Sequence, residues 1–217
     1  FLYRGRDVTE EQIASVFKDI STSQPSCDGL VYDLKSIRVE AIREDTKYGG
    51  WRVTLKACLG NIRIPLQFDI GFGDAITPEP EKVTYPSMLF NVSPKRMAYP
   101  MATMVAEKCA IMVELGFANS RMKDFFDVWT ILKEFEISED LLKTAISATF
   151  KRRGTKLDST KPLCFTEEFS SDKRKSAQWK AFLRKNGNEA DCPIEFNTIA
   201  DFITSKIYPL LPKVDSK

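Results

Sequence analysis

The sequence predicts an α+β protein in which a strand-rich α/β lobe is followed by a helical lobe. Over residues 61–70, apolar side chains recur at every second position, which is the period of a β-strand. After Pro100 the period changes to about 3.6 residues, which is the period of a helix. The glycines and proline within residues 71–78 separate the two patterns. We therefore predict two domains, residues 1–95 and residues 96–217.

The first predicted element is a helix of about a dozen residues that starts at Thr9. Thr9 and Gln12 have the spacing of a capping box, in which each side chain bonds to the backbone N–H of the other residue. One face of this helix carries the apolar residues Ile13, Val16, Phe17 and Ile20. Residues 21–36 contain Pro25 and Gly29 and are predicted to form a loop.

Three strands are predicted next. Residues 37–43 and 51–57 flank Tyr48-Gly49-Gly50, which suits the turn of a hairpin. Along residues 61–70, one face is expected to carry Ile62, Ile64, Leu66, Phe68 and Ile70. Pro65 lies on the opposite face and has no N–H to donate, so this strand should be bulged or lie near an edge of the sheet.

The second half of the chain is predicted to be helical. Residues 74–99 should be mostly loop, with a short strand at 87–92, and residues 154–171 should form an irregular link. Capping and helix-breaking residues delimit the predicted helices. These helices cover residues 100–116, 120–135, 138–150, 172–186 and 195–207.

The composition narrows the possible chemistry. The chain has no histidine, which excludes Ser-His and Cys-His nucleophiles and histidine metal sites. Carboxylates, Lys and Arg remain, together with metals that prefer oxygen ligands, such as Mg²⁺. The five cysteines are widely spaced and form no C-x-x-C pair, which indicates a reduced, cytoplasmic protein. The sequence contains no recognisable signal peptide and no apolar stretch long enough to cross a membrane, so a membrane partner is not expected. The net charge of +2 does not by itself predict nucleic-acid binding.

Asp69 is the first candidate site residue. It lies at the end of the alternating strand, opposite the apolar face and directly before Gly71-Phe72-Gly73-Asp74. A carboxylate at a strand end can hold a divalent cation, and glycine lets a phosphate approach the backbone. The same position also suits an aspartate that only caps a turn.

Lys108 is the second candidate, because it falls within an apolar helical stripe. The stripe consists of Met101, Met104, Val105, Cys109 and Met112. A lysine in such a helix needs an anion to offset its desolvation. The anion could be a triphosphate, a catalytic carboxylate or a structural Asp or Glu. Alternatively, the long side chain could carry its ammonium group out to water.

The third candidate is a charged segment at a helix start. Arg121, Asp124 and Asp127 are three residues apart and share one side of the helix, and Lys123 lies beside them. This arrangement suits a phosphate or metal site. It also suits an exposed network of ion pairs within one helix. Two basic runs, Lys151-Arg152-Arg153 and the one around Lys173-Arg174-Lys175, could contact RNA phosphates or form solvated helix faces.

Four blocks of the sequence together resemble one family. They are Leu66–Pro78, Tyr99-Pro100 with Val105-Ala106-Glu107-Lys108, Asn119–Asp127, and Ala145–Thr155. In order and spacing they are similar to AbiEii/AbiGii-type nucleotidyltransferase toxins of abortive-infection, or type IV, toxin–antitoxin systems. The resemblance implies a nucleotidyltransferase-like mixed-sheet lobe, incomplete in this chain, followed by a helical lobe.

The resemblance also implies roles for the candidate residues. Family members transfer a nucleotide from an NTP, with Mg²⁺, to an acceptor, which is a tRNA 3′ end for some relatives, and a cognate antitoxin counters them. By this resemblance Lys108 contacts the nucleotide phosphates, with help from Arg121 and Lys123. Asp124 or Asp127 is the essential acid of the helical lobe. Asp69 is the carboxylate of the third catalytic strand and the metal ligand.

The chain departs from the family pattern in one respect. Members carry a Gly-Ser turn followed by an Asp-x-Asp pair that holds the metals, and neither motif occurs here. The run Phe1–Asp7 is similar to the segment that directly follows that pair, so we expect an N-terminally truncated and inactive polypeptide. The competing hypotheses are a non-catalytic binding module of a toxin–antitoxin system and a kinase-like phosphotransferase that uses the same NTP site.

Overall fold

The computed structural model describes residues 2–3, 8–23, 29–42, 49–72, 76–87, 93–187 and 192–212. The chain forms two compact units, Phe1–Asp74 and Ala75–Lys217. These units meet earlier in the chain than the predicted domain boundary at residue 95. The division into functional domains 1–95 and 96–217 remains a prediction.

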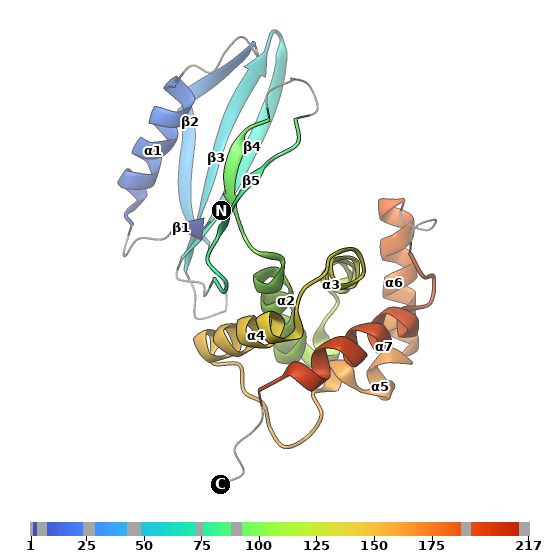
Figure 1. Ribbon diagram of the computed structural model, residues 1–217. Coiled ribbons are helices and arrows are strands. Elements are labelled where there is room, and N and C mark those ends of the chain that lie inside the picture. Colours follow the sequence, from blue (N-terminus) through green and yellow to red (C-terminus); the bar gives the residue numbers. More distant parts are fainter. Residues whose placement is uncertain are drawn as a thin grey trace. The chain divides into compact units, whose positions relative to one another are not determined.

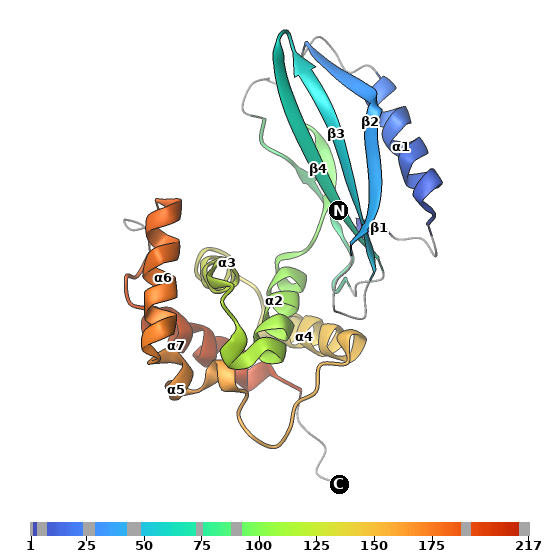
Figure 2. The same cartoon turned by 180° about the vertical axis from the view of Figure 1, so that it is seen from behind.

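The first unit contains a four-stranded mixed sheet, which confirms the predicted α+β class (Figure 1). Its strands follow one another in the order β1-β4-β3-β2, and all neighbours are antiparallel except β1 and β4. Viewed from either side, β2, β3 and β4 lie next to one another (Figure 2). The strands are β1 (Leu2–Tyr3), β2 (Leu30–Ile42), β3 (Gly50–Leu59) and β4 (Ile62–Phe72).

Helix α1 (Glu10–Thr22) packs against this sheet next to β2. The predicted capping box is present, because the Thr9 and Gln12 side chains each bond to the other residue's backbone N–H. Ile13 is buried, and the Phe17 ring lies 5.1 Å from that of Phe68 on β4. The predicted apolar stripe is only partly covered, because the helix lies on the sheet along the side of Ile13 and Phe17. The other two stripe residues are exposed: Val16 (52%) and Ile20 (59%).

The strand predictions are correct in the middle of the sheet and wrong at one end. The predicted hairpin is formed by β2 and β3, although residues 43–48 of its turn lie outside the described residues. The predicted loop over 21–36 is wrong at its end, because β2 begins at Leu30 and pairs there with Leu59. Pro65 pairs with Lys56 of β3, and β1 joins β4 only at Gly71 and Phe72. In the described sheet Pro65 therefore lies at an edge, as predicted.

The second unit starts with a hairpin that the sequence did not predict. Its strands are β5 (Glu81–Thr84) and β6 (Lys95–Ala98), which pair in antiparallel fashion within the predicted loop 74–99. Of the predicted strand 87–92, residues 88–92 lie outside the described residues, and Ser87 belongs to no strand. Both strands are short and mostly exposed, so the apolar alternation that marks a longer strand is missing.

The rest of the second unit is mostly helical, as predicted. The predicted irregular link 154–171 is wrong at its end, because the short helix α5 (Glu167–Ser170) forms within it, where the Thr166 side chain accepts a hydrogen bond from the backbone N–H of Phe169. Ser138 caps its helix through Leu141 N–H, and Gly154 ends the same helix with a left-handed conformation (φ 64°). Within the described residues, no helix combines the length and the apolar character needed to cross a bilayer. The helices are α2 (Met101–Leu115), α3 (Met122–Glu134), α4 (Glu139–Arg153), α5 (Glu167–Ser170), α6 (Lys173–Asn186) and α7 (Phe196–Ile207).

A cluster of aromatic rings joins these helices. Phe125 of α3 lies 5.8 Å from Phe169 of α5 and 5.2 Å from Phe196 of α7, measured between ring centroids. Trp179 of α6 lies 5.9 Å from Phe196. All four side chains are fully buried, and such pairs contribute about 0.5–1.5 kcal/mol each beyond the burial of their area. This core fixes the position of α3, whose first turns carry the charged candidates.

Candidate active site

Lys108 reaches the candidate site from an apolar helix. In α2 the buried residues surround it on the chain, with Val105, Ala106, Cys109 and Ala110 all fully buried. The Lys108 side chain keeps 19% exposure. Its ammonium group does not escape to water unpaired, as one interpretation of the sequence allowed, because it meets two carboxylates on α3.

The carboxylates are held by the turn between α2 and α3. Gly116 ends α2 with a positive φ of 47°, a conformation that glycine adopts without strain. The buried side chain of Asn119 then accepts a hydrogen bond of 2.8 Å from the backbone N–H of Arg121. Helix α3 starts at Met122, so Asp124 lies in its first turn and faces α2.

Five charged side chains form one connected group, which we call the α2–α3 charge cluster. Lys108 Nζ lies 2.7 Å from Asp124 Oδ1 and 2.7 Å from Asp127 Oδ2. Arg121 Nε donates to the other oxygen of Asp124 at 2.7 Å. Lys123 Nζ donates to both oxygens of Asp127, at 2.6 and 2.8 Å. The structure therefore brings together all of the predicted site residues that belong to the second unit.

The acids of the charge cluster are buried and its outer cations are exposed. The side chains of Asp124 and Asp127 are 5% and 18% exposed, whereas those of Arg121 and Lys123 are 58% and 72% exposed. A network confined to the surface of one helix, which the sequence also allowed, would not bury its aspartates or include a lysine from a second helix. The two acids hold three cations in place, and the exposed cations Arg121 and Lys123 leave an excess of positive charge facing solvent.

The pKa values follow from these pairings. Burial alone would lower the pKa of Lys108, but hydrogen bonds to Asp124 and Asp127 outweigh it and raise the pKa above its ordinary value. Burial would raise the pKa of Asp127, but hydrogen bonds from Lys108 and Lys123 outweigh it and lower the pKa. These groups therefore stay charged across the neutral range, which a site for anionic phosphates requires.

Lys175 supports the cluster and was missed in the sequence, where it belongs to a basic run. It is only 4% exposed, and its ammonium group donates to the backbone oxygens of Phe117 at 2.7 Å and Asn119 at 2.6 Å. Burial lowers the pKa of Lys175, although the charge of Asp172 opposes this shift. Lys175 thus fixes the turn that positions Arg121. In the sequence, Lys175 looks like the other lysines of the basic run, so nothing there predicts this role.

Asp69 belongs to the first unit, apart from the charge cluster in the chain. It lies on the exposed face of β4, as predicted, and its carboxylate accepts hydrogen bonds from Arg52 of β3 at 2.8 and 3.0 Å. These bonds lower the pKa of Asp69. The side chains are 49% and 41% exposed, so the pair contributes little to stability. Gly73 and Asp74, which follow it in the predicted motif, lie outside the described residues.

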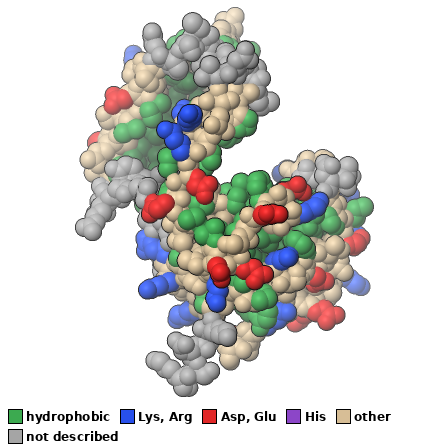
Figure 3. Space-filling view, viewed as in Figure 1, with side chains coloured by type: hydrophobic (Ala, Val, Ile, Leu, Met, Phe, Trp, Pro, Cys, Tyr) green, Lys and Arg blue, Asp and Glu red, His purple; other side chains and the backbone are tan. Residues whose placement is uncertain are grey.

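The described residues contain no cluster of metal ligands, because no three Asp, Glu, His or Cys side chains gather among them. Asp124 and Asp127 are already bonded to cations, and Asp69 is bonded to Arg52. The cationic groups, in contrast, suit phosphate oxygens. Acidic and basic side chains are interspersed on the visible face of the helical unit, without a continuous basic surface there (Figure 3).

Comparison with known proteins decides the family. Residues 1–201 match the family model described as "Nucleotidyl transferase AbiEii toxin, Type IV TA system". This chain belongs to the AbiEii nucleotidyltransferase toxin family. No curated protein matches the chain.

Membership of the AbiEii family confirms the resemblance seen in the sequence. It implies a nucleoside triphosphate as substrate and an antitoxin as partner. The match covers Asp69 of the first unit and the whole charge cluster of the second. It does not by itself assign the acceptor, the metal or the role of any residue.

Proposed function

We propose that this AbiEii protein acts as a toxin by transferring a nucleotide from an NTP to an RNA acceptor such as tRNA. In this reaction an RNA hydroxyl oxygen bonds to the α-phosphorus of the NTP, and the bond from that phosphorus to the β-phosphate bridge breaks. Pyrophosphate leaves, and the hydroxyl proton passes to solvent. Family membership supports the reaction type, and the absence of histidine is consistent with chemistry that needs positioning and charge more than a nucleophilic side chain.

The observation that carries the proposal is Lys108, held between Asp124 and Asp127 beside an exposed Arg121. We assign Lys108 to the nucleotide phosphates, with Arg121 and Lys123 adding positive charge. Cations held in advance by buried acids need no reorganisation when charge develops on the phosphates.

The two acids have different proposed roles. Asp124 is the more buried and joins Lys108 to Arg121, so we propose that it is the essential acid and acts by positioning both cations. Asp127 holds Lys108 and Lys123 from the other side and is the second candidate.

Asp69 keeps its proposed role as a catalytic carboxylate and metal ligand. It would need further ligands, such as substrate phosphates, because it belongs to no group of three or more candidate ligands among the described residues. Mg²⁺, if bound there, would neutralise phosphate charge, and Arg52 would have to release the carboxylate.

The second candidate function is a non-catalytic binding module of a phage-defence toxin–antitoxin system. It is favoured by one observation, which is that the 217 residues contain no Gly-Ser turn followed by an Asp-x-Asp pair. On this second candidate function, the 217 residues alone are expected to show no transfer.

The test uses the protein from the complete reading frame, NTPs labelled at the α-phosphate, and total RNA. We expect the label to enter RNA, and we expect Lys108→Ala and Asp124→Ala to abolish labelling. Lys143→Ala is a matched control, because Lys143 is an exposed lysine on α4. Unchanged labelling in both site variants would refute the assignment. Absence of RNA labelling in the wild type would favour the binding module.

A further inference from the structure

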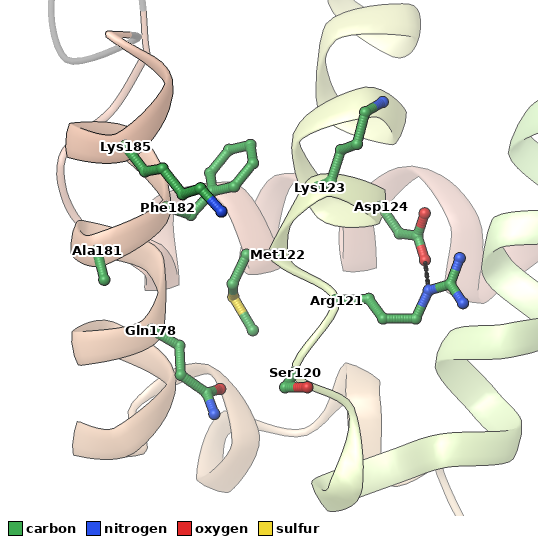
Figure 4. Close-up of a pocket in the computed structure, with 9 residues that line it drawn as sticks. All are labelled: Ser120, Arg121, Met122, Lys123, Asp124, Gln178, Ala181, Phe182 and Lys185. Carbon is green, nitrogen blue, oxygen red and sulfur yellow. Dashed lines mark hydrogen bonds and ion pairs between the residues drawn. The ribbon is translucent and has the colours of Figure 1, made fainter. Parts of the chain in front are cut away.

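A pocket of about 510 Å³ lies between the start of α3 and the second half of α6 (Figure 4). Its volume falls within the range of about 300–1,000 Å³ that is typical of ligand sites. Its walls include Met122 from α3 and Phe182 from α6. Arg121 and Asp124 of the charge cluster also line it, so the pocket adjoins the candidate active site.

Phe182 presents a fixed aromatic surface to this pocket. Its ring stacks on that of Trp179, with 5.5 Å between centroids and 27° between planes, and lies 5.7 Å from the ring of Phe126. Trp179 itself is fully buried and cannot meet a ligand. Of the two aromatic residues of α6, only Phe182 is therefore available for stacking.

Polar groups surround the aromatic wall. Gln178 lines the pocket, and its buried Oε1 atom has no hydrogen-bond partner among the described residues, which leaves the amide group free to turn toward a ligand. Lys185 reaches from α6 toward Met122 (Figure 4). It forms no ion pair with any residue that the structure describes, whereas Lys180 of the same helix pairs with Glu195.

An aromatic surface, an amide and an unpaired cation are the groups that bind single-stranded nucleic acid. Helix α6 has no acidic residue, and three of its cations, Lys173, Arg184 and Lys185, form no ion pair with a described residue. Arg121, which we assign to the NTP phosphates, points away from α6 toward Asp124 (Figure 4). This direction favours a second nucleic-acid ligand in the pocket over the base of the same NTP.

We propose that this pocket binds a base at the single-stranded end of the acceptor RNA. Phe182 stacks on the base, Gln178 bonds to its edge, and Lys185 contacts a neighbouring phosphate. This inference rests on the proposed function, in which RNA accepts the nucleotide, and it places the acceptor end beside the charge cluster.

The test measures the binding of a short, fluorescently labelled single-stranded RNA by anisotropy, and the binding of ATP in parallel. We expect Phe182→Leu to raise the Kd for RNA roughly tenfold, which is about 1.4 kcal/mol. Binding of ATP, and of an abasic RNA of the same length, should not change. We expect Lys185→Ala to reduce the slope of log K against log salt by about 0.7, as for one lost phosphate contact.

Matched variants control for effects on folding. Phe135→Leu and Lys143→Ala make the same changes at exposed positions outside the pocket and should leave RNA binding unchanged. Gln178→Leu tests the pocket without altering the aromatic core and should also weaken RNA binding. Thermal unfolding of each variant shows whether it is folded.

The outcomes separate this inference from the proposed function. If Phe182→Leu leaves RNA binding unchanged, or weakens ATP binding instead, the inference is wrong. If the inference fails in this way but Lys108→Ala still abolishes ATP binding, the proposed nucleotide site remains supported. If the wild type binds neither ATP nor RNA, both proposals are overturned.

Discussion

Lys175→Met is the sharpest test of how the charge cluster is positioned. Methionine keeps most of the apolar stem but leaves the backbone oxygens of Phe117 and Asn119 without the ammonium group that they now bond. Hydrogen bonds to a charged group contribute about 1.5–3 kcal/mol each, so two of them amount to about 3–6 kcal/mol. Removal of the buried charge returns part of this, because its desolvation is unfavourable. We expect the free energy of unfolding to fall by about 2–3 kcal/mol.

The assay is thermal or urea unfolding followed by tryptophan fluorescence in a Trp51→Phe background, in which the remaining Trp129 and Trp179 both belong to the second unit. A loss of about 2–3 kcal/mol corresponds to a fall in Tm of about 4–12 °C for a protein of this size. Lys173→Met is the matched control, because Lys173 is exposed on the same helix, and it should change stability by less than about 0.5 kcal/mol. An unchanged midpoint for Lys175→Met would show that the two hydrogen bonds do not hold the turn.

Three further predictions concern the charged residues themselves. Asp124→Asn should lower the free energy of unfolding by about 2–3 kcal/mol and Asp127→Asn by about 1 kcal/mol, because Asp124 is the more buried of the two. Urea unfolding measures both losses, and equal losses would contradict this order. Because the pKa of Asp127 is lowered, its pairing stabilises the protein fully above its ordinary pKa of 3.8, and this stability is lost as pH falls through the lowered pKa. Because the pKa of Lys108 is raised, the pairing persists above the ordinary lysine pKa of 10.5. Asp127→Asn should therefore be less stable than the wild type at neutral pH but equally stable in strong acid, and a difference that persists there would refute the pairing. Asp69→Asn should change stability by less than about 1 kcal/mol, because its pair with Arg52 is half-exposed, so any loss of activity in this variant would not reflect unfolding.

Local signals in the sequence were sufficient for many elements. The capping box of Thr9 and Gln12 and the cap at Ser138 mark helix starts through bonds within a few residues, and both are present. The start of β2 was missed because Leu30 follows a segment with proline and glycine, and its strand character depends on pairing with Leu59, distant in the chain. Tertiary pairing of this kind leaves no periodic pattern in a short segment.

The candidate site was predictable only in part, because some of its contacts depend on local sequence patterns and others on tertiary packing. Lys108 stood out because a cation in an apolar helix needs an anion, and the spacing of Asp124 and Asp127 placed both acids on one helix face. That the lysine meets both acids depends on the packing of α2 against α3, which no local pattern specifies. Lys175 could not be distinguished from the solvated lysines around it, because its partners are backbone atoms of a distant turn.

The central claim is that Lys108 and its acids hold an NTP whose nucleotide, and not its terminal phosphate, is transferred to RNA. The most direct measurement compares NTPs labelled at the α-phosphate and at the γ-phosphate, with the protein from the complete reading frame and total RNA. We predict that RNA takes up only the α-label and that Lys108→Ala abolishes the uptake. Transfer of the γ-label, or uptake of the α-label that does not depend on Lys108, would contradict the account.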